Sequence, residues 1–211
     1  MNIVNYLTEI YGYDTPIFLK DIRIGRKSKT AIRQEVFRAT KNGELERKGN
    51  GIYFIRGKRD FGSGVIFDDV LKRKFIYSKN APVGFEELFV EGYYSGMTFL
   101  NMLGISEQVP AIPEITTNRT SSKKRFYTMG DSFAIIRKGK TVITFQNYLM
   151  LQFLDMFHFV SREDIRKNKA LIKAYIKEKQ LAKQQLNQFI GLYSQQTMKK
   201  IVEEGLLDAF I

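Results

Sequence analysis

The chain has 211 residues, of which 44% are apolar and 27% charged, and its formal net charge is +12. This length and apolar content predict a folded protein of one or two domains and argue against a disordered chain. Because cysteine is absent, disulfide bonds and thiolate metal sites are excluded, and a cytoplasmic location needs no further assumption.

The apolar residues are not gathered into a membrane segment. The richest stretch, residues 148–160, is interrupted by Gln152, Asp155 and His158, and apolar runs stay well below the roughly 18 residues that a span requires. The first residues also lack the basic and apolar regions of a signal peptide. We therefore expect a soluble, cytoplasmic protein without a membrane partner.

The positive charge is concentrated near the amino end. The first 59 residues contain 13 lysines and arginines against 6 acidic residues, whereas residues 60–161 contain 11 against 10 and residues 162–211 contain 10 against 6. Such an excess favours an anionic partner, which could be nucleic acid, an acidic protein or a lipid surface.

Three helices are predicted in the first 42 residues. Residues 1–11 have apolar side chains at helical spacing. Thr15 and Pro16 then provide a cap and a first helical position, which predicts a short second helix over residues 15–23. Residues 24–27 contain a glycine and have the length of a turn that lets the next helix leave at a steep angle.

The third predicted helix starts at its cap, Ser28, and stops at Asn42. Ile32 and Val36 fall on its inward stripe because they lie four residues apart. Glu35 is the only acidic residue between Ser28 and Asn42, although an ordinary solvated helix mixes both signs of charge. The outer face of this helix therefore suits a polyanion.

Residues 45–55 read as two strands joined at residues 49–51, where the Asn50-Gly51 pair favours a tight hairpin turn. Helix, turn, helix and basic hairpin together predict a winged helix-turn-helix. An ordinary solvated helix and hairpin is the alternative, but the agreement of caps, turn length, stripe and hairpin favours DNA binding.

One face of this predicted domain is expected to contact double-stranded DNA. Base readout is expected from the helix, with Arg33 paired to guanine and Gln34 to adenine, and the turn and hairpin are expected to hold phosphates. The residues predicted to bind DNA are Arg26, Lys27, Ser28, Lys29, Thr30, Arg33, Gln34, Arg38, Arg47, Lys48 and Asn50.

A glycine-rich, charged stretch over residues 56–64 predicts a linker or loop between domains. We place the boundary after residue 60, which gives a DNA-binding domain over residues 1–60 and a second domain over residues 61–211. The Gly-Ser-Gly run at residues 62–64 lacks the Gly-Lys-Ser/Thr ending of a phosphate loop and does not predict one.

The second domain is predicted to be α+β, with a small antiparallel sheet followed by carboxyl-terminal helices. Its clearest strands cover residues 126–129 and 133–137 and are separated by Gly130-Asp131. Helices are predicted over residues 65–77, 92–103, 145–159, 161–180, 181–190 and 195–210, and weaker strands over residues 114–118 and 142–143.

Catalytic signals are weak. Asp68 and Asp69 would point about 100° apart on a helix and would not converge on one metal ion. His158, the only histidine, lies between two phenylalanines and is expected to be packed rather than catalytic. We predict no cofactor, no metal and no enzymatic activity; the alternative is an enzyme that modifies nucleic acid or a toxin and is delivered by the DNA-binding domain.

Several short runs carry a family resemblance. Residues 103–110 read Leu-Gly-Ile-Ser-Glu-Gln-Val-Pro, and they are followed by residues 114–118, by Gln146-Asn147 and by residues 151–155. Together with the predicted winged helix, these runs resemble the AbiEi family of antitoxins from bacterial abortive-infection systems. The resemblance covers roughly residues 1–160.

The resemblance implies a type IV toxin-antitoxin module of two genes. Its antitoxin represses its own promoter by binding inverted repeats through the winged helix, and its other domain counters a nucleotidyltransferase toxin without a stable complex between the two proteins. No antitoxic residues are carried over to this sequence. A generic winged-helix regulator remains the alternative.

A second basic region lies near the carboxyl end. It can serve solubility, phosphate contacts, a toxin-facing surface or self-association. Its lysines are Lys167, Lys169, Lys173, Lys177 and Lys183.

Overall fold

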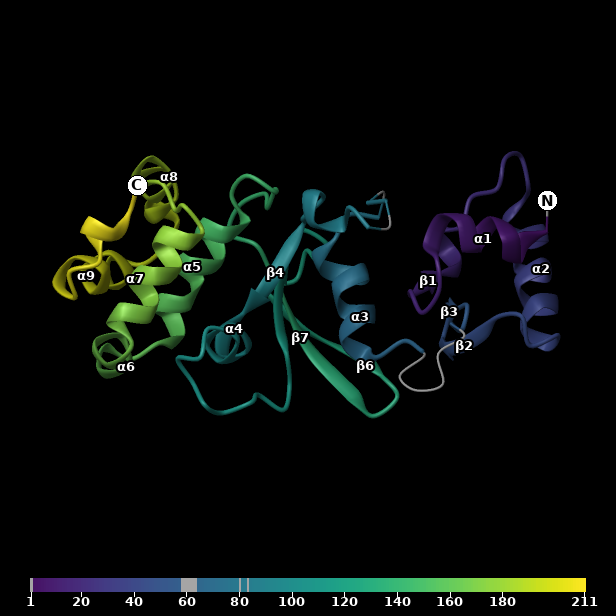
Figure 1. The fold of residues 1–211 in the computed structure, drawn as a ribbon, viewed down its shortest axis with the longest axis horizontal. Helices are drawn as coiled ribbons and strands as arrows, with labels where there is room; N and C mark the ends of the chain where they lie inside the picture. The colour runs from purple at the N-terminus through teal and green to yellow at the C-terminus, as the bar shows by residue number, and fades with distance from the viewer. Residues whose placement is uncertain (1, 58–63, 80, 83) are drawn as a thin grey trace. The chain divides into compact units, whose positions relative to one another are not determined.

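The computed structural model describes residues 2–57, 64–79, 81–82 and 84–211, and over these residues the fold is mixed α+β with nine α-helices (Figure 1). It divides into two compact units, Met1–Phe89 with Met129–Ser132 and Val90–Thr128 with Phe133–Ile211. The predicted boundary at residue 60, with most of the predicted linker, lies in residues 58–63 and so outside the described residues. Every described helix is too short or too polar to cross a membrane.

Two capped helices supply the core of the first unit. In α1 (Ile3–Tyr11), Asn2 Oδ1 accepts a hydrogen bond from the Val4 amide at 3.1 Å. In α2 (Lys29–Lys41), Ser28 Oγ accepts from the Ala31 amide at the same distance. Their inward faces meet in one apolar cluster. The predictions of both helices and of the Ser28 cap are confirmed.

The segment between these helices differs from the prediction. The described chain has no α-helix over residues 15–23; β1 (Ile17–Phe18) is followed there by a short 3-10 helix (Leu19–Asp21). The hydroxyl of Thr15 donates to the Tyr13 carbonyl at 3.2 Å instead of capping a helix. Both side chains of β1 are buried against the sheet, and this burial outweighs the local helix-start signal.

The predicted hairpin is confirmed as β2 (Glu46–Gly49) and β3 (Ile52–Phe54). β3 is the central strand of an antiparallel sheet of order β1-β3-β2. A bulge falls between Arg47 and Gly49, and Gly51 turns the chain with a left-handed φ of +69°. The sheet therefore presents a tight basic tip next to α2.

After the hairpin, the described residues of the first unit include further short helical elements. The predicted helix over residues 65–77 appears as α3 (Phe67–Leu71), which continues into a π-helical turn (Lys72–Ile76). Asp69 caps this helix by accepting from the Ile66 amide at 3.1 Å, and Asp68 pairs with Lys72 at 2.7 Å. The two aspartate side chains therefore make contacts within this helical segment. A 3-10 turn (Glu86–Leu88) follows.

The second unit contains a four-stranded sheet of order β4-β5-β7-β6 (Figure 1). β4 pairs antiparallel with β5, but β5 pairs parallel with β7, so the sheet is mixed and the predicted purely antiparallel sheet is wrong. After β5 the chain first forms the edge strand β6. It then returns as β7, which lies between β5 and β6. The strands are β4 (Gly92–Ser95), β5 (Glu114–Thr117), β6 (Lys124–Met129) and β7 (Ser132–Lys138).

Two local predictions in this unit are wrong. Residues 92–103 form β4 before α4 (Gly96–Met102), because tyrosine-rich residues at 93 and 94 pair with β5 and Gly96 turns the chain with φ +61°. Residues 142–143 form no strand. Instead, the Ile143 amide donates to Asn118 Oδ1 at 2.9 Å, which fixes this loop beside the sheet.

Helix α5 (Tyr148–Phe159) is the centre of the second core and packs against β4, as predicted for residues 145–159. Gln152 Nε2 donates to the Tyr94 carbonyl of β4 at 2.8 Å. Phe153 stacks its ring with that of Tyr175 at a centroid separation of 6.2 Å. His158 is exposed, so its predicted packing in the core is wrong.

Four further helices surround α5. Ser161 Oγ accepts from the Asp164 amide at 3.0 Å and so caps the first of them. The helices are α6 (Arg162–Lys167), α7 (Lys169–Glu178), α8 (Lys183–Phe189) and α9 (Gln195–Glu203).

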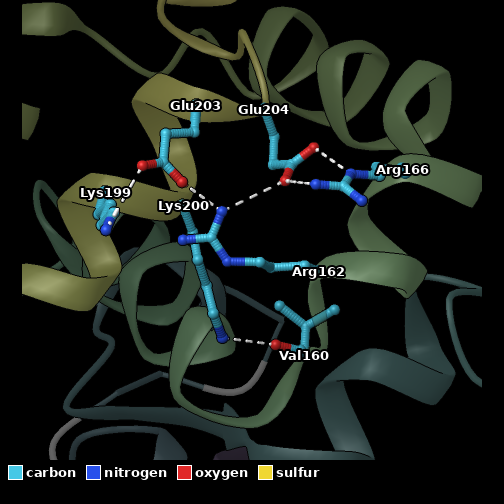
Figure 2. A network of polar contacts seen from close by, with 7 residues as sticks. All are labelled: Val160, Arg162, Arg166, Lys199, Lys200, Glu203 and Glu204. Atoms are coloured by element: carbon cyan, nitrogen blue, oxygen red, sulfur yellow. Dashed lines mark hydrogen bonds and ion pairs between the residues drawn. The ribbon is translucent and has the colours of Figure 1, made fainter.

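A network of charged side chains joins α9 to α6 (Figure 2). Glu204, only 6% exposed, accepts from Arg166 Nε at 3.0 Å and from Arg166 Nη2 at 3.1 Å, and lies 3.6 Å from Arg162. Arg162 also donates to Glu203. A buried carboxylate is stable there because two guanidinium groups compensate its charge.

The same network closes the end of α5. Lys200 Nζ donates to the Val160 carbonyl at 2.7 Å (Figure 2). It also donates to the Phe157 carbonyl at 2.8 Å. These are carbonyls that the helix itself leaves unpaired, and an ammonium group there also suits the helix dipole. Burial, with the nearby charge of Arg162, lowers the pKa of Lys200.

Candidate nucleic-acid interface

All eleven residues predicted to bind DNA are exposed in the first unit. They come from three consecutive pieces: the turn before α2, α2 itself and the β2-β3 hairpin. The turn has its predicted form, because the Lys27 amide donates to the Ile24 carbonyl at 2.9 Å and Gly25 has φ +48°. Arg26 is exposed in this turn, immediately before the Ser28 cap.

The outer face of α2 brings four of the predicted residues together. Thr30, Arg33, Gln34 and Arg38 line one shallow hollow on the helix surface, and Phe37 lines it with them. Side chains three and four residues apart share a helix face, which explains the grouping. The face therefore offers hydroxyl, guanidinium and amide donors side by side on one surface of the helix.

A second hollow, of about 350 Å³, lies between α2 and the hairpin. Lys29 and Arg33 line it from α2, and Asn50 lines it from the hairpin turn. Arg33 thus belongs to both hollows. Helix and hairpin residues predicted from separate sequence signals share one surface.

Several of these cations have no carboxylate partner. Within the described residues, five of the basic side chains predicted to bind DNA form no ion pair at 4.0 Å or less. Their charge is therefore not neutralised by the part of the protein that the structure describes. These side chains are Arg26, Lys29, Arg33, Arg38 and Lys48.

Lys27 and Ser28 differ from the other members of the set. Lys27 Nζ lies 2.7 and 2.8 Å from the two carboxylate oxygens of Glu35, in the second turn of α2. This pair fastens the turn to the helix and leaves less charge for a phosphate. The Ser28 hydroxyl is occupied as the cap of α2.

Arg47 shapes the hairpin tip. Its Nε donates to the Gly49 carbonyl at 3.2 Å and its Nη2 to Asn50 Oδ1 at 2.9 Å. At the base of the hairpin, Arg56 pairs with Glu46, and this hydrogen bond lowers the pKa of the Glu46 carboxyl. The guanidinium of Arg47 therefore orders the tip and places Asn50, and Lys48 is the free cation of β2.

Several contributors to this surface were not predicted from the sequence. Phe37 is 69% exposed in the middle of the basic face of α2, and its position off the apolar stripe was a readable signal. Lys20, Arg23 and Lys74 line the hollow between α2 and the hairpin. Lys74 belongs to α3's π-helical extension, so only the folded chain brings it there.

Comparison with known proteins adds no family. Neither the models of known protein families nor the curated proteins gave a significant match to this chain.

The runs that carry the AbiEi resemblance fall in the second unit. Residues 103–110 follow α4, where Asn101 Nδ2 donates to the Ser106 carbonyl at 3.1 Å. Gln146-Asn147 precede α5, and the Asn147 side chain accepts from the Thr144 amide at 2.8 Å and donates to the Val142 carbonyl at 2.9 Å. These residues hold loops in place.

Proposed function

We propose that the first unit is a winged-helix DNA-binding domain that recognises inverted repeats in a promoter and represses transcription. The observation that carries this proposal is the shared basic surface of α2 and the hairpin, where Lys29, Arg33 and Asn50 line one hollow. In this arrangement α2 is the recognition helix and the β2-β3 hairpin is the wing. The 3-10 turn at Leu19–Asp21 takes the place of the middle helix.

Base contacts belong to the exposed face of α2. Arg33 can donate two hydrogen bonds to guanine, and Gln34 can pair with adenine. Phe37 lies on the same face one turn after Arg33, and it supplies an apolar surface for a thymine methyl group.

Phosphate contacts belong to the flanks. The unpaired cations Arg26, Arg38 and Lys48 supply charge without reading sequence. Lys27 is a weaker candidate because Glu35 already holds it. Asn50 is positioned by Arg47 and can donate its amide N–H groups to a phosphate or a base edge.

We further propose that the chain is an AbiEi-like antitoxin of a type IV module. The resemblance of its sequence runs to that family supports this assignment. Repression of its own promoter follows from occupying the inverted repeats, and the second unit counters a nucleotidyltransferase toxin.

A promoter-reporter assay tests the DNA-binding proposal. The region upstream of the gene is fused to a reporter, and we expect the wild-type chain to repress it and the Lys29→Ala/Arg33→Ala double variant to lose most repression. The matched control is Lys177→Ala/Lys183→Ala, which removes the same charge from exposed positions of the second unit. Equal losses in both variants would refute the assigned surface.

A growth assay tests the antitoxin proposal separately. The chain is co-expressed with a nucleotidyltransferase encoded by the neighbouring gene, and we expect it to restore growth. The Lys29→Ala/Arg33→Ala variant should restore growth equally well when both genes are driven from a foreign promoter. Failure of the wild-type chain to rescue would leave a generic winged-helix regulator.

We propose a regulator rather than an enzyme. Incubation of the purified chain with duplex DNA, RNA or the toxin is expected to leave each of them chemically unchanged, as followed by mass spectrometry. Cleavage or a new covalent group on any of them would favour the alternative of a modifying enzyme delivered by its DNA-binding domain.

A further inference from the structure

The second unit contains a hollow of about 330 Å³ that the DNA-binding proposal does not use. Basic side chains line it from β7 and from the loops before and after the β6-β7 hairpin. Asp155, His158 and Phe159 line it from α5, and Tyr193 from the segment before α9. Its volume lies in the range of small-molecule sites in proteins and is suited to one nucleotide.

Three lysines give the hollow its positive charge. Among the described residues, Lys123, Lys138 and Lys140 have no carboxylate within 4.0 Å, and Lys140 Nζ lies 4.9 Å from the centre of the Tyr193 ring. Arg137 also lines the hollow but is paired through Nε with Glu114 at 2.9 Å. Three uncompensated ammonium groups around one concave site favour a ligand with several negative charges.

The placement of Lys140 depends on a close turn of the backbone. A side chain at Gly139 would approach the Thr141 carbonyl oxygen to 2.9 Å, so this turn has no room for a Cβ atom. The same loop is held by Asn118, whose Nδ2 donates to the Ile143 carbonyl at 2.7 Å. The lysine is therefore carried by an ordered loop.

Hydrogen bonds fix the polar groups on the sheet side of the hollow. Asp155 Oδ2 accepts from Tyr93 Oη at 2.7 Å and lies 3.5 Å from Thr116 Oγ1, which in turn lies 2.9 Å from Ser95 Oγ. Burial raises the pKa of Asp155, while the Tyr93 bond and the charge of Lys140 oppose the rise. This carboxyl group can accept a hydrogen bond from a hydroxyl or amino group of a ligand.

Aromatic surface completes the site. The rings of His158 and Phe159 are arranged edge to face with centroids 5.1 Å apart, and the Arg137 guanidinium carbon lies 5.8 Å from the Phe159 centroid. Rings of this kind stack on nucleobases regardless of base identity.

We propose that this hollow binds a nucleoside phosphate, with the phosphates on Lys138 and Lys140 and the sugar or base next to Asp155. Inorganic phosphate would use the lysines but neither the carboxyl group nor the rings. A nucleic-acid strand would extend beyond a hollow of single-nucleotide size. The inference rests on the second unit alone and does not depend on DNA binding by the first.

Calorimetric titration of the full chain with ATP and, separately, with GTP tests the proposal. We expect at least one of them to bind with 1:1 stoichiometry and Lys140→Ala to weaken binding about tenfold, because one charge-assisted contact is lost. Lys177→Ala is the matched control on an exposed helix position and should not change the affinity. Arg33→Ala, on the basic face of the first unit, should not change it either.

Three results would overturn the proposal. The first is the absence of binding by both nucleotides, and the second is an equal loss in Lys140→Ala and Lys177→Ala. The third is tighter, Lys140-dependent binding of a short oligouridylate, which would make the hollow part of a single-strand RNA site. Asp155→Asn serves as a second variant: we expect weaker nucleotide binding with an unchanged circular dichroism spectrum, which shows that the fold is retained.

Discussion

Arg33 and Lys48 are expected to make different contributions to DNA binding. Arg33 lines both hollows of α2, whereas Lys48 is exposed on β2. We expect Arg33→Ala to cost about 1 to 3 kcal/mol on the operator and to relax the preference at one base pair. Lys48→Ala should weaken every duplex alike and reduce the salt slope of binding by about one unit. Fluorescence anisotropy on operator and scrambled duplexes distinguishes these effects, and equal, sequence-independent losses would refute the division.

Asp155 is expected to make stability depend on pH. Because burial raises its pKa above the ordinary value of 3.8, the folded chain holds this proton more tightly than the unfolded chain does. The resulting stabilisation is complete below pH 3.8 and is lost as the pH rises through the folded pKa.

Asp155→Asn should therefore remove this part of the pH dependence. Urea denaturation at pH values from about 4 to about 8 should show that the free energy of unfolding changes less with pH in the variant than in the wild type. The opposite change, a steeper fall in the variant, would show that another group is responsible.

At the scale of elements, the polar network around Glu204 is expected to hold α9 in place. Glu204→Gln removes a buried charge that two arginines compensate, and Arg166 is 67% exposed and can be solvated once it is released. We expect the free energy of unfolding to fall by about 1 to 2 kcal/mol.

The control for this change lies on α6. Glu163→Gln breaks the ion pair with Lys167, in which the lysine side chain is 67% and the glutamate side chain 74% exposed. Because water screens such a pair, the free energy of unfolding should stay nearly unchanged. Urea denaturation followed by circular dichroism measures both variants. Equal losses would contradict the special role of the buried carboxylate.

Elements with local signals were predicted well from the sequence. Ser28 and Ser161 mark their helices because a hydroxyl capping an amide acts within three residues, and Asn50-Gly51 marks its turn for a similar reason. β1 and β4 were missed because their pairing partners lie about 20 or more residues away. Such strands depend on contacts that local patterns do not contain.

The candidate sites show the same contrast. The face of α2 follows from helical spacing, so most of its residues, and Phe37 as well, were accessible to sequence reasoning. The hollow of the second unit was not, since Asp155, Lys140 and Tyr193 come from separate elements. Its residues become neighbours only when β7 is inserted beside β5 in a parallel register.

At the scale of the whole molecule, we assign the net charge of +12 to two separate binding surfaces. We propose that the first unit presents part of it to duplex DNA and that the second unit presents another part to a nucleoside phosphate. A nucleotide could therefore act as a signal for a DNA-bound regulator, but the two binding events are tested independently. DNA binding is the claim on which the regulatory function depends.

The most direct test is an anisotropy titration of the full chain on a labelled duplex that carries the inverted repeat of its own promoter, over a range of salt concentrations. The account predicts binding at least about a hundredfold tighter than to a scrambled duplex, with an affinity that falls as salt rises, at a slope of about 0.9 per phosphate contacted. The absence of association at low salt, or equal affinity for both duplexes, would contradict it.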